Sequence, residues 1–331
     1  MVLRTPGDIS RNPLEHLDWP VPEPGSDEVL IKVAFCGVCH TDLHTVEGEL
    51  PETKPPLVPG HQIVGRVVRR GKSVVRFKEG DRVGAAWLYS ACGQCDFCRS
   101  GRENLCRLAR FTGYRVNGGF AEYFVISEKF AYALPDGFSD EEAAPLLCGG
   151  IIGYRALRLS EIKAGQRLGL FGFGASAHVA IQVARHWGCE VYVFTRSAEH
   201  RRLANSLGAA WTGASEDDPP GKLHGAIIFA PAGTLVRDAL PKLERGGTLA
   251  LAGITMSPIP ELEYDRYLYH ERTLRSVANA TRQDGQDLLA IAAEIPIRTT
   301  VQVFDLKDAN RALGLLKKGR INGAAVLRIP S

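Results

Sequence analysis

The first part of the chain consists of short apolar runs separated by turns that contain Gly and Pro. These runs are rich in β-branched and aromatic residues, a composition typical of β-strands. The predicted strands cover residues 29–35, 63–69, 82–87 and 121–126. This part of the chain therefore reads as a compact β-rich domain.

From about Gly165 the pattern changes, and strand-like runs alternate with helical ones. Strands are predicted over 167–171, 190–194, 225–229 and 247–252, and helices over 175–187, 198–207 and 235–243. Such alternation predicts a doubly wound parallel sheet, and the nearly all-apolar last strand fits burial on both faces. A helix near 306–318 and a strand over 324–329 follow, and they either return to the first domain or extend the sheet.

Length and composition describe an ordinary globular protein. The 331 residues suffice for about two domains, and 45% hydrophobic and 23% charged residues fit that class. The net charge of +3 is too diffuse to indicate a nucleic-acid partner. The N-terminus has no signal-peptide core, and no apolar run approaches the roughly 20 residues of a membrane span, so we expect a cytoplasmic protein without a membrane partner.

Half of the eight cysteines lie in one short loop. They are Cys92, Cys95, Cys98 and Cys106. This spacing is typical of a closed, tetrahedral and therefore structural zinc site, and Gly93 and Gly101 supply tight turns for wrapping the ion. The alternatives are four loop thiols without metal or a disulfide pair, which a reducing compartment disfavours.

A phosphate-binding turn follows the predicted strand 167–171. Its residues are Gly172, Phe173, Gly174, Ala175, Ser176 and Ala177, which form a G-x-G-x-x-A pattern and open into a helix. The first glycine permits the tight turn, the second allows backbone to approach a pyrophosphate, and Ala177 allows close helix packing. The turn therefore predicts a dinucleotide cofactor.

The end of the next strand favours NADP over NAD. An Asp or Glu usually stands there and binds the ribose hydroxyls of NAD, whereas this chain has Thr195, Arg196 and Ser197. A guanidinium with two hydroxyls can accept a 2′-phosphate through charge-assisted hydrogen bonds. The alternative is that Arg196 is solvated or stacks on adenine, and that NAD binds without the acidic residue.

A second set of metal-ligating residues is scattered along the chain. Residues 36–44 read Cys-Gly-Val-Cys-His-Thr-Asp-Leu-His, His61 follows after a loop, and Cys148 lies far downstream. Two cysteines and one histidine would leave a fourth zinc position open, as in catalytic sites. Taken alone, Cys148 also fits a buried thiol and His61 a hydrogen-bonded loop histidine.

These motifs, together with Gly60–Gly65, appear in the order found in the zinc-dependent alcohol dehydrogenases of the medium-chain dehydrogenase/reductase superfamily. The chain resembles the bacterial and yeast-type branch of this family, and the resemblance covers nearly the whole chain. The resemblance implies an α/β protein with a GroES-like catalytic domain, formed by residues 1–147 and 288–331, and a Rossmann cofactor domain over 148–287. The active site would lie in the cleft between them.

The resemblance also assigns roles to single residues. The catalytic zinc ligands would be Cys39, His61 and Cys148, which leaves Cys36 as a core thiol. Thr41 resembles the residue whose hydroxyl forms a hydrogen bond with the substrate oxygen, and His44 resembles the histidine that passes the substrate proton to solvent. Asp42 resembles the carboxylate that orients a zinc-bound imidazole. Matching residues near cofactor and substrate are His40 at the pyrophosphate, Trp87 in the substrate pocket, and Ser276, Val277, Ala278 and Asn279 at the nicotinamide amide. The alternative for Trp87 is an ordinary core tryptophan.

Two positions depart from the family pattern. Gln62 replaces the carboxylate that normally follows the ligand histidine, and a neutral residue there should leave zinc slightly more electrophilic. Residues 323–326 lack the arginine with which many relatives contact the cofactor phosphates. Cofactor affinity would then depend more on His40 and Arg196.

These observations predict a zinc-dependent alcohol dehydrogenase or aldehyde reductase. It would transfer hydride reversibly between a small primary or secondary alcohol and NAD(P), with NADP favoured, and hold one catalytic and one structural zinc per subunit. The resemblance implies a homo-oligomer, either a dimer or a tetramer, and of these we expect the tetramer. The alternatives are a polyol or aryl-alcohol dehydrogenase of the same fold, and a non-catalytic protein that binds zinc and NADPH.

Overall fold

The computed structural model describes residues 1–331 except 52, 322 and 331. The chain forms two compact units, unit 1 from residues 1–148 and 281–331 and unit 2 from residues 149–280. The sequence-based boundary after residue 287 would cut helix α9 (Arg282–Glu294), which lies wholly in unit 1. Thr281 caps this helix and Glu103 binds Arg282, so the crossing between units falls just before it.

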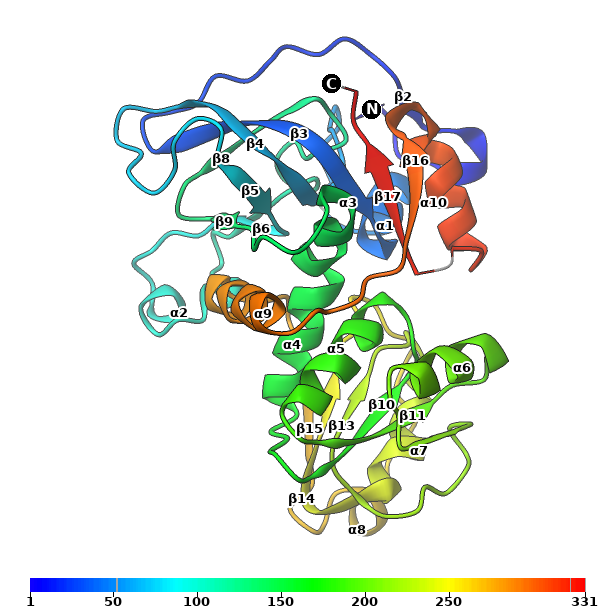
Figure 1. The fold of residues 1–331 in the computed structure, drawn as a ribbon. Coiled ribbons are helices and arrows are strands. Elements are labelled where there is room, and N and C mark those ends of the chain that lie inside the picture. The colour runs from blue at the N-terminus through cyan, green and yellow to red at the C-terminus, as the bar shows by residue number, and fades with distance from the viewer. Residues whose placement is uncertain (52, 322, 331) are drawn as a thin grey trace. The chain divides into compact units, whose positions relative to one another are not determined.

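Unit 1 is built on a seven-stranded mixed sheet (Figure 1). Its strands are β3 (Glu28–Val38), β4 (Gln62–Arg70), β5 (Arg82–Ala85), β8 (Tyr123–Ser127), β9 (Ala131–Ala133), β16 (Val301–Asp305) and β17 (Ala324–Arg328). The order is β16-β17-β3-β4-β5-β9, and β8 also pairs with β3. Two small sheets pair β1 (Val2–Leu3) with β2 (Leu14–Glu15) and β6 (Leu88–Ser90) with β7 (Arg110–Phe111).

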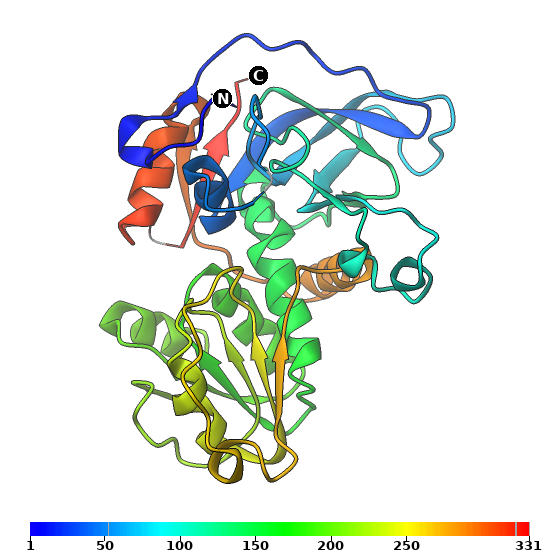
Figure 2. The same cartoon turned by 180° about the vertical axis from the view of Figure 1, so that it is seen from behind.

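Short helices surround this sheet. Besides α9 they are α1 (His40–Glu47), α2 (Asp96–Arg99), α3 (Asp140–Ala143) and α10 (Ala309–Lys317), with 3-10 turns at Ile9–Arg11, Glu103–Leu105, Ala144–Leu147 and Leu306–Asp308. Helix α10 packs against α1 (Figure 2). The predicted helix 306–318 is therefore a 3-10 turn followed by α10.

The C-terminal tail lies in unit 1. Strand β17 runs antiparallel to β3, with Ala325 opposite Val38, and β16 adds to β17 in parallel. Of the two alternatives left open by the sequence, this is the one that the family resemblance implies. The tail thereby covers the edge of β3 beside the residues that lead into α1.

Unit 2 is a parallel sheet with helices packed on it (Figure 1). Its strands are β10 (Arg167–Phe171), β11 (Glu190–Phe194), β12 (Trp211–Gly213), β13 (Leu223–Ile228), β14 (Leu243–Leu251) and β15 (Thr273–Ser276), and its helices are α4 (Gly149–Leu159), α5 (Ala175–His186), α6 (Ala198–Ser206), α7 (Leu235–Ala239) and α8 (Tyr264–Tyr267). The strand order is β12-β11-β10-β13-β14-β15, and every pairing is parallel. The predicted GroES-like and doubly wound fold class is confirmed.

The predicted helix 235–243 is shorter than expected. Helix α7 ends at Ala239, and a 3-10 turn over Leu240–Lys242 leads into β14. Pro241 explains the change, because proline has no backbone N–H to continue the α-helical hydrogen bonds. Among the described residues, no helix combines the length and apolar character needed to span a bilayer.

Candidate functional site

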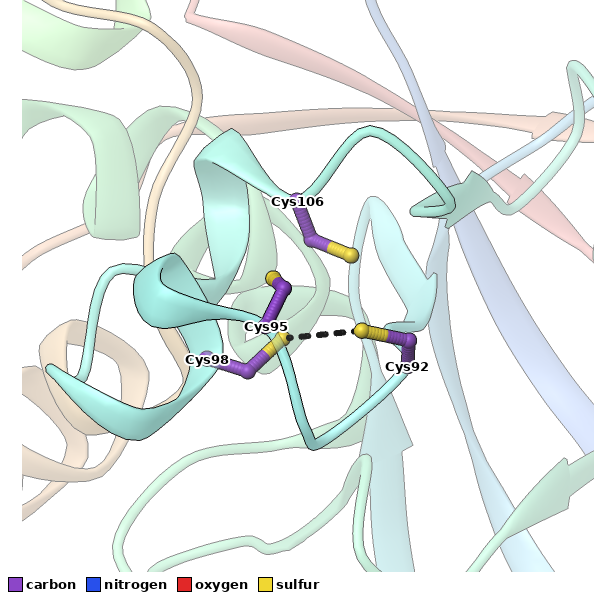
Figure 3. A group of neighbouring side chains, drawn as sticks. All are labelled: Cys92, Cys95, Cys98 and Cys106. Atoms are coloured by element: carbon purple, nitrogen blue, oxygen red, sulfur yellow. Dashed lines mark hydrogen bonds between the residues drawn. The ribbon is translucent and has the colours of Figure 1, made fainter.

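The four loop cysteines come together in unit 1 between β6 and β7 (Figure 3). Their sulfur atoms all lie within 4.8 Å of one another, and none forms a disulfide. The Sγ atoms of Cys92 and Cys98 are 3.8 Å apart. Four Zn–S bonds of usual length in a tetrahedron would place sulfur atoms about 3.8 Å apart, so this donor set fits a closed zinc site.

The loop also prepares its thiols for metal binding. Backbone N–H groups of Gln94 and Cys95 donate to Cys92 and lower the pKa of its thiol to about 6. Desolvation raises the pKa of Cys98 to about 12. Cys92 is therefore a thiolate near neutral pH, which is the form that binds zinc, whereas Cys98 must release a proton when the metal binds.

Cys39, His61 and Cys148 form the second cluster, also in unit 1. Cys39 precedes α1, His61 precedes β4, and Cys148 ends the turn before α4. His61 Nε2 lies 3.4 Å from Cys39 Sγ and 3.3 Å from Cys148 Sγ, and the two sulfur atoms are 3.9 Å apart. In a tetrahedral zinc site these edges would be about 3.6 Å for N–S and about 3.8 Å for S–S.

This triangle of donors therefore has the size and chemistry of a three-ligand zinc site. Three protein donors leave one corner of the tetrahedron for a further ligand. Cys36 is not among these three donors, and its side chain is fully buried in the core of unit 1. The Sγ of Cys36 donates a hydrogen bond to the carbonyl of Gly37 instead.

Asp42 holds the cluster in place. Its Oδ1 accepts hydrogen bonds from His61 Nδ1 at 2.9 Å and from the Gly60 backbone at 3.2 Å. Its Oδ2 accepts from the Cys39 backbone at 3.0 Å, and Cys39 Sγ accepts from the Asp42 backbone; these two bonds form a capping box at the start of α1. Cys39 Sγ also accepts from Thr41 N at 3.3 Å. The carboxylate thus fixes two of the three donors, and it leaves Nε2 of His61 to face the thiols.

The ionisable groups of the cluster shift one another strongly. Burial alone would lower the pKa of His61, but the charges and hydrogen bonds of Asp42 and Cys39 raise it to about 10. The hydrogen bond from Cys148 holds the pKa of Cys39 well below its usual value, and the same bond together with burial raises the pKa of Cys148. Burial also raises the pKa of Asp42. A cation bound by the three donors would replace the protons that they share here.

The two predicted relay residues lie on α1. Thr41 and His44 are three residues apart and therefore neighbours on the helix surface; Thr41 is buried, and His44 is 18% exposed. His44 Nδ1 lies 2.5 Å from Oε2 of Glu49, a residue that the sequence analysis did not single out. Gly48, at a left-handed backbone position after α1, was the available signal for this turn.

Trp87 lies beside the second cluster. The centroids of the Trp87 and His61 rings are 5.0 Å apart in a T-shaped arrangement, and Trp87 stacks on Phe111 and Tyr114 with centroid distances of 5.3 and 5.7 Å. Trp87 was predicted from the sequence, whereas its two aromatic partners were not, because residues 111 and 114 lie beyond the cysteine loop. The stack gives the neighbourhood of His61 a flat and rigid wall.

Gln62, which replaces the family carboxylate, is buried in β4. It lies opposite Gly37 of β3, where an added Cβ would stand 2.7 Å from the Gln62 side chain. The amide thus packs on the neighbouring strand beside Cys36 rather than facing solvent.

The predicted phosphate turn follows β10 in unit 2. Gly172 has φ of 86°, and a Cβ there would meet Ala230 at 3.0 Å. A Cβ at Gly174 would meet nothing within 4 Å, so its backbone is open to a ligand. Gly174 caps α5 without a side-chain hydrogen bond, and Ala177 is fully buried. The free N–H groups at this helix start suit a pyrophosphate.

The other cofactor segments share one edge of this sheet with the turn. Residues 172–177 follow β10, 195–197 follow β11, and 276–279 begin at the end of β15. All strands are parallel, so their carboxyl ends meet at the same edge, where such folds bind dinucleotides. Asn279 has φ of 60°, and its buried Nδ2 has no hydrogen-bond partner among the described residues.

The residues after β11 differ in burial and in hydrogen bonding. Thr195 is buried, with its N–H bonded to Gly213, and Ser197 accepts from His200 N as the cap of α6. Arg196 is exposed and forms no ion pair within the described part of the chain. His40, at the first position of α1, is also exposed.

Comparison with known proteins places the chain in a family. The alcohol dehydrogenase GroES-like domain model matches residues 25–136, and the zinc-binding dehydrogenase model matches residues 177–294. A probable alcohol dehydrogenase, AdhA, of Mycobacterium tuberculosis (strain CDC 1551 / Oshkosh) is 49% identical over 332 residues, which cover 99% of this chain and 96% of that protein.

Several solved structures are similar to this chain over most of their length. A cinnamyl alcohol dehydrogenase from Sorghum bicolor has a TM-score of 0.88 and 29% identity, covering 98% of this chain and 96% of that one. The structure of CAD from Helicobacter pylori complexed with NADP(H) has a TM-score of 0.83 and 27% identity, covering 92% and 91%.

A β-rich unit with two clusters of thiol and imidazole donors, joined to a doubly wound parallel sheet, defines a two-domain dehydrogenase of the zinc type. The matched families and relatives agree with this class. The chain belongs to the zinc-type alcohol dehydrogenases of the medium-chain dehydrogenase/reductase superfamily, and it is an oxidoreductase of alcohols and aldehydes.

Proposed function

We propose that this alcohol dehydrogenase carries its catalytic zinc on Cys39, His61 and Cys148, and a structural zinc on the loop cysteines. The triangle of two sulfur atoms and one Nε2, with edges of 3.3, 3.4 and 3.9 Å, carries this proposal, because its edges match a zinc tetrahedron with one open corner. The closed set of four thiolates supports a purely structural second ion.

When bound, zinc supplies a Lewis acid for the substrate oxygen, and the nicotinamide nucleotide supplies the hydride acceptor or donor. The chain supplies orientation and proton transfer. Asp42 holds the tautomer of His61 that presents Nε2 to the ion, and it positions Cys39 through the capping box. The buried Thr41 hydroxyl takes the proton of the alcohol, and His44, one helical turn on, passes it to solvent.

The cofactor is proposed to be NADP rather than NAD. The strand end after β11 carries no carboxylate to repel a 2′-phosphate, and the exposed Arg196, which forms no ion pair with any described residue, can donate to one. The Thr195 and Ser197 hydroxyls flank it, and Ser197 Oγ, which accepts from His200 N, can still donate its own proton. That the similar Helicobacter pylori protein was solved with NADP(H) supports the same choice.

The substrate is proposed to be a small alcohol or aldehyde with a flat group next to the reacting carbon. The support is the aromatic stack of Trp87 with Phe111 and Tyr114, because the Trp87 ring centroid lies 5.0 Å from that of His61. A rigid aromatic face binds planar groups well, and it offers few hydrogen bonds to a polyol. An aryl-alcohol dehydrogenase is therefore favoured over a polyol dehydrogenase.

Initial rates with a short primary alcohol, a branched alcohol and benzyl alcohol, each with NAD and NADP, test this function. Turnover should be higher with NADP, and highest for benzyl alcohol. The Thr41→Ala variant separates an enzyme from a non-catalytic binding protein, because turnover should fall about 100-fold while cofactor binding is kept. Equal turnover in Thr41→Ala would contradict the relay.

The enzyme is further proposed to be a homo-oligomer, a dimer or a tetramer, as the family resemblance implies. Light scattering of the purified protein tests this point. A monomer at all concentrations would contradict it.

A further inference from the structure

Glu49 is folded back onto His44 by the turn that ends α1. Gly48 adopts φ of 78°, a left-handed conformation that glycine tolerates best. The backbone N–H of Glu49 donates to the carbonyl of His44 at 2.9 Å, and that of Gly48 donates to Thr45 at 3.2 Å. These two bonds form a Schellman motif, so the position of Glu49 depends on its backbone and on Gly48, not on its side chain.

The carboxylate of Glu49 meets one specific ring atom of His44. Oε2 lies 2.5 Å from Nδ1, and no described residue binds Nε2. A carboxylate oxygen can only accept, so Nδ1 carries a proton, and in the neutral ring Nε2 then presents its lone pair. The His44 side chain is 18% exposed and that of Glu49 is 52% exposed, so the pair lies at the border between protein and water.

We propose that Glu49 is a positioning residue for the proton relay: it holds His44 in the tautomer whose Nε2 accepts the substrate proton. This inference rests on the proposed function of Thr41 and His44. During alcohol oxidation the O–H bond of the substrate breaks, Thr41 passes the proton on, and a new N–H bond forms at Nε2. The Glu49 carboxylate then faces an imidazolium, which gives its proton to water and returns to the starting tautomer.

A purely structural role for the Glu49 side chain is a weak alternative. The carboxylate is half-exposed, and such surface pairs contribute little to stability. Glu47, two residues earlier, is the structural carboxylate of this helix end, because it binds Lys317 of α10 at 2.6 Å and the Ile9 backbone at 2.9 Å. It provides a matched control.

The test compares Glu49→Gln, Glu49→Asp, His44→Ala, the double variant of His44→Ala with Glu49→Gln, and Glu47→Gln as control. With zinc content matched, kcat for alcohol oxidation should fall about 100-fold in His44→Ala, which removes the base. It should fall about tenfold in Glu49→Gln, because this variant keeps the base and loses only its positioning. Glu49→Asp should recover part of this loss, the melting temperature should not change in Glu49→Gln, and Glu47→Gln should keep its turnover.

Two measurements distinguish a positioning role of Glu49 from a structural one. In the His44→Ala background, Glu49→Gln should change nothing further, because the carboxylate acts only through the ring. The 15N shifts of the His44 ring, assigned with His44→Ala, should report Nδ1–H in the wild type and a mixture of tautomers in Glu49→Gln.

The outcomes distinguish this role from the relay itself. A normal loss in His44→Ala with unchanged turnover and tautomer in Glu49→Gln would overturn the role of Glu49 alone. An equal loss from Glu49→Gln with and without His44 would also overturn it. Unchanged turnover in His44→Ala would contradict the relay, and with it the role of Glu49.

Discussion

Asp42 accepts a hydrogen bond from Nδ1 of His61 at 2.9 Å, and both side chains are only 1% exposed. The same carboxylate closes the capping box of α1 through the Cys39 backbone. A single side chain therefore connects the start of a helix with two donors of the candidate zinc site.

We predict that Asp42→Asn weakens zinc binding at this site by about 10–100-fold, because the amide no longer favours the His61 tautomer that presents Nε2. Competition with a chromophoric chelator measures the affinity. Asp284→Asn is the matched control, since Asp284 closes the capping box of α9 and is fully buried. That control should lose stability and keep its zinc, whereas equal zinc loss in both variants would contradict a specific role of Asp42.

Cys92→Ala should empty the loop site and leave the other site occupied. Zinc content should fall from about two to about one per subunit, and the melting temperature should fall by roughly 10 °C, because metal binding free energy becomes folding free energy. Elemental analysis and calorimetry measure the two effects. Loss of both ions, or of neither, would show that the two sites are not independent.

Arg196→Gln should lower kcat/KM for NADP by about 10–100-fold, the effect of losing a charge-assisted hydrogen bond, and change kcat/KM for NAD little. Arg202→Gln, an exposed substitution on the following helix, is the control. If the preference for NADP were unchanged in Arg196→Gln, the phosphate would be bound elsewhere.

The ion pair of Glu103 with Arg282 predicts a pH dependence of stability. Burial opposes ionisation of Glu103, but hydrogen bonds from its own backbone and from Arg282, and the Arg282 charge, hold its pKa below the usual value. The stabilisation is thus complete above the unfolded pKa of about 4.3 and is lost as the pH falls below it. The melting temperature of Glu103→Gln should lie below that of the wild type at pH 7, and the difference should shrink as the pH falls through the lowered pKa of Glu103 in the folded protein. A difference in melting temperature that did not change with pH would contradict a stabilising role of ionised Glu103.

The elements that the sequence predicted well are those with a local signal. The strands before Gly172 and Thr195 are short apolar runs bounded by turn residues, and the structure has them at the predicted residues. Helix α1 was not predicted, because its eight residues carry only a weak apolar face and its cap is the unusual Cys39. It forms because tertiary contacts bury Leu43 and Val46 against the core of unit 1.

The candidate site was predicted only in part. The loop cysteines are close in sequence, so their spacing was sufficient, whereas Cys148 lies 109 residues from Cys39 and needed the family resemblance. The pair of His44 with Glu49 depends on one left-handed residue, and that of Glu103 with Arg282 spans 179 residues. Contacts of the latter kind follow from the fold and leave no pattern along the chain.

The most direct test of the zinc assignment is stepwise chelation of the intact enzyme, with zinc content and NADP-linked alcohol oxidation measured on the same samples. The open site should release its ion before the closed thiolate loop, so activity should disappear with the first equivalent of zinc and return when one equivalent is added back. The His61→Ala variant should hold about one zinc and show no turnover. Loss of activity while both ions remain bound, or full activity after the first ion has left, would contradict catalysis at Cys39, His61 and Cys148.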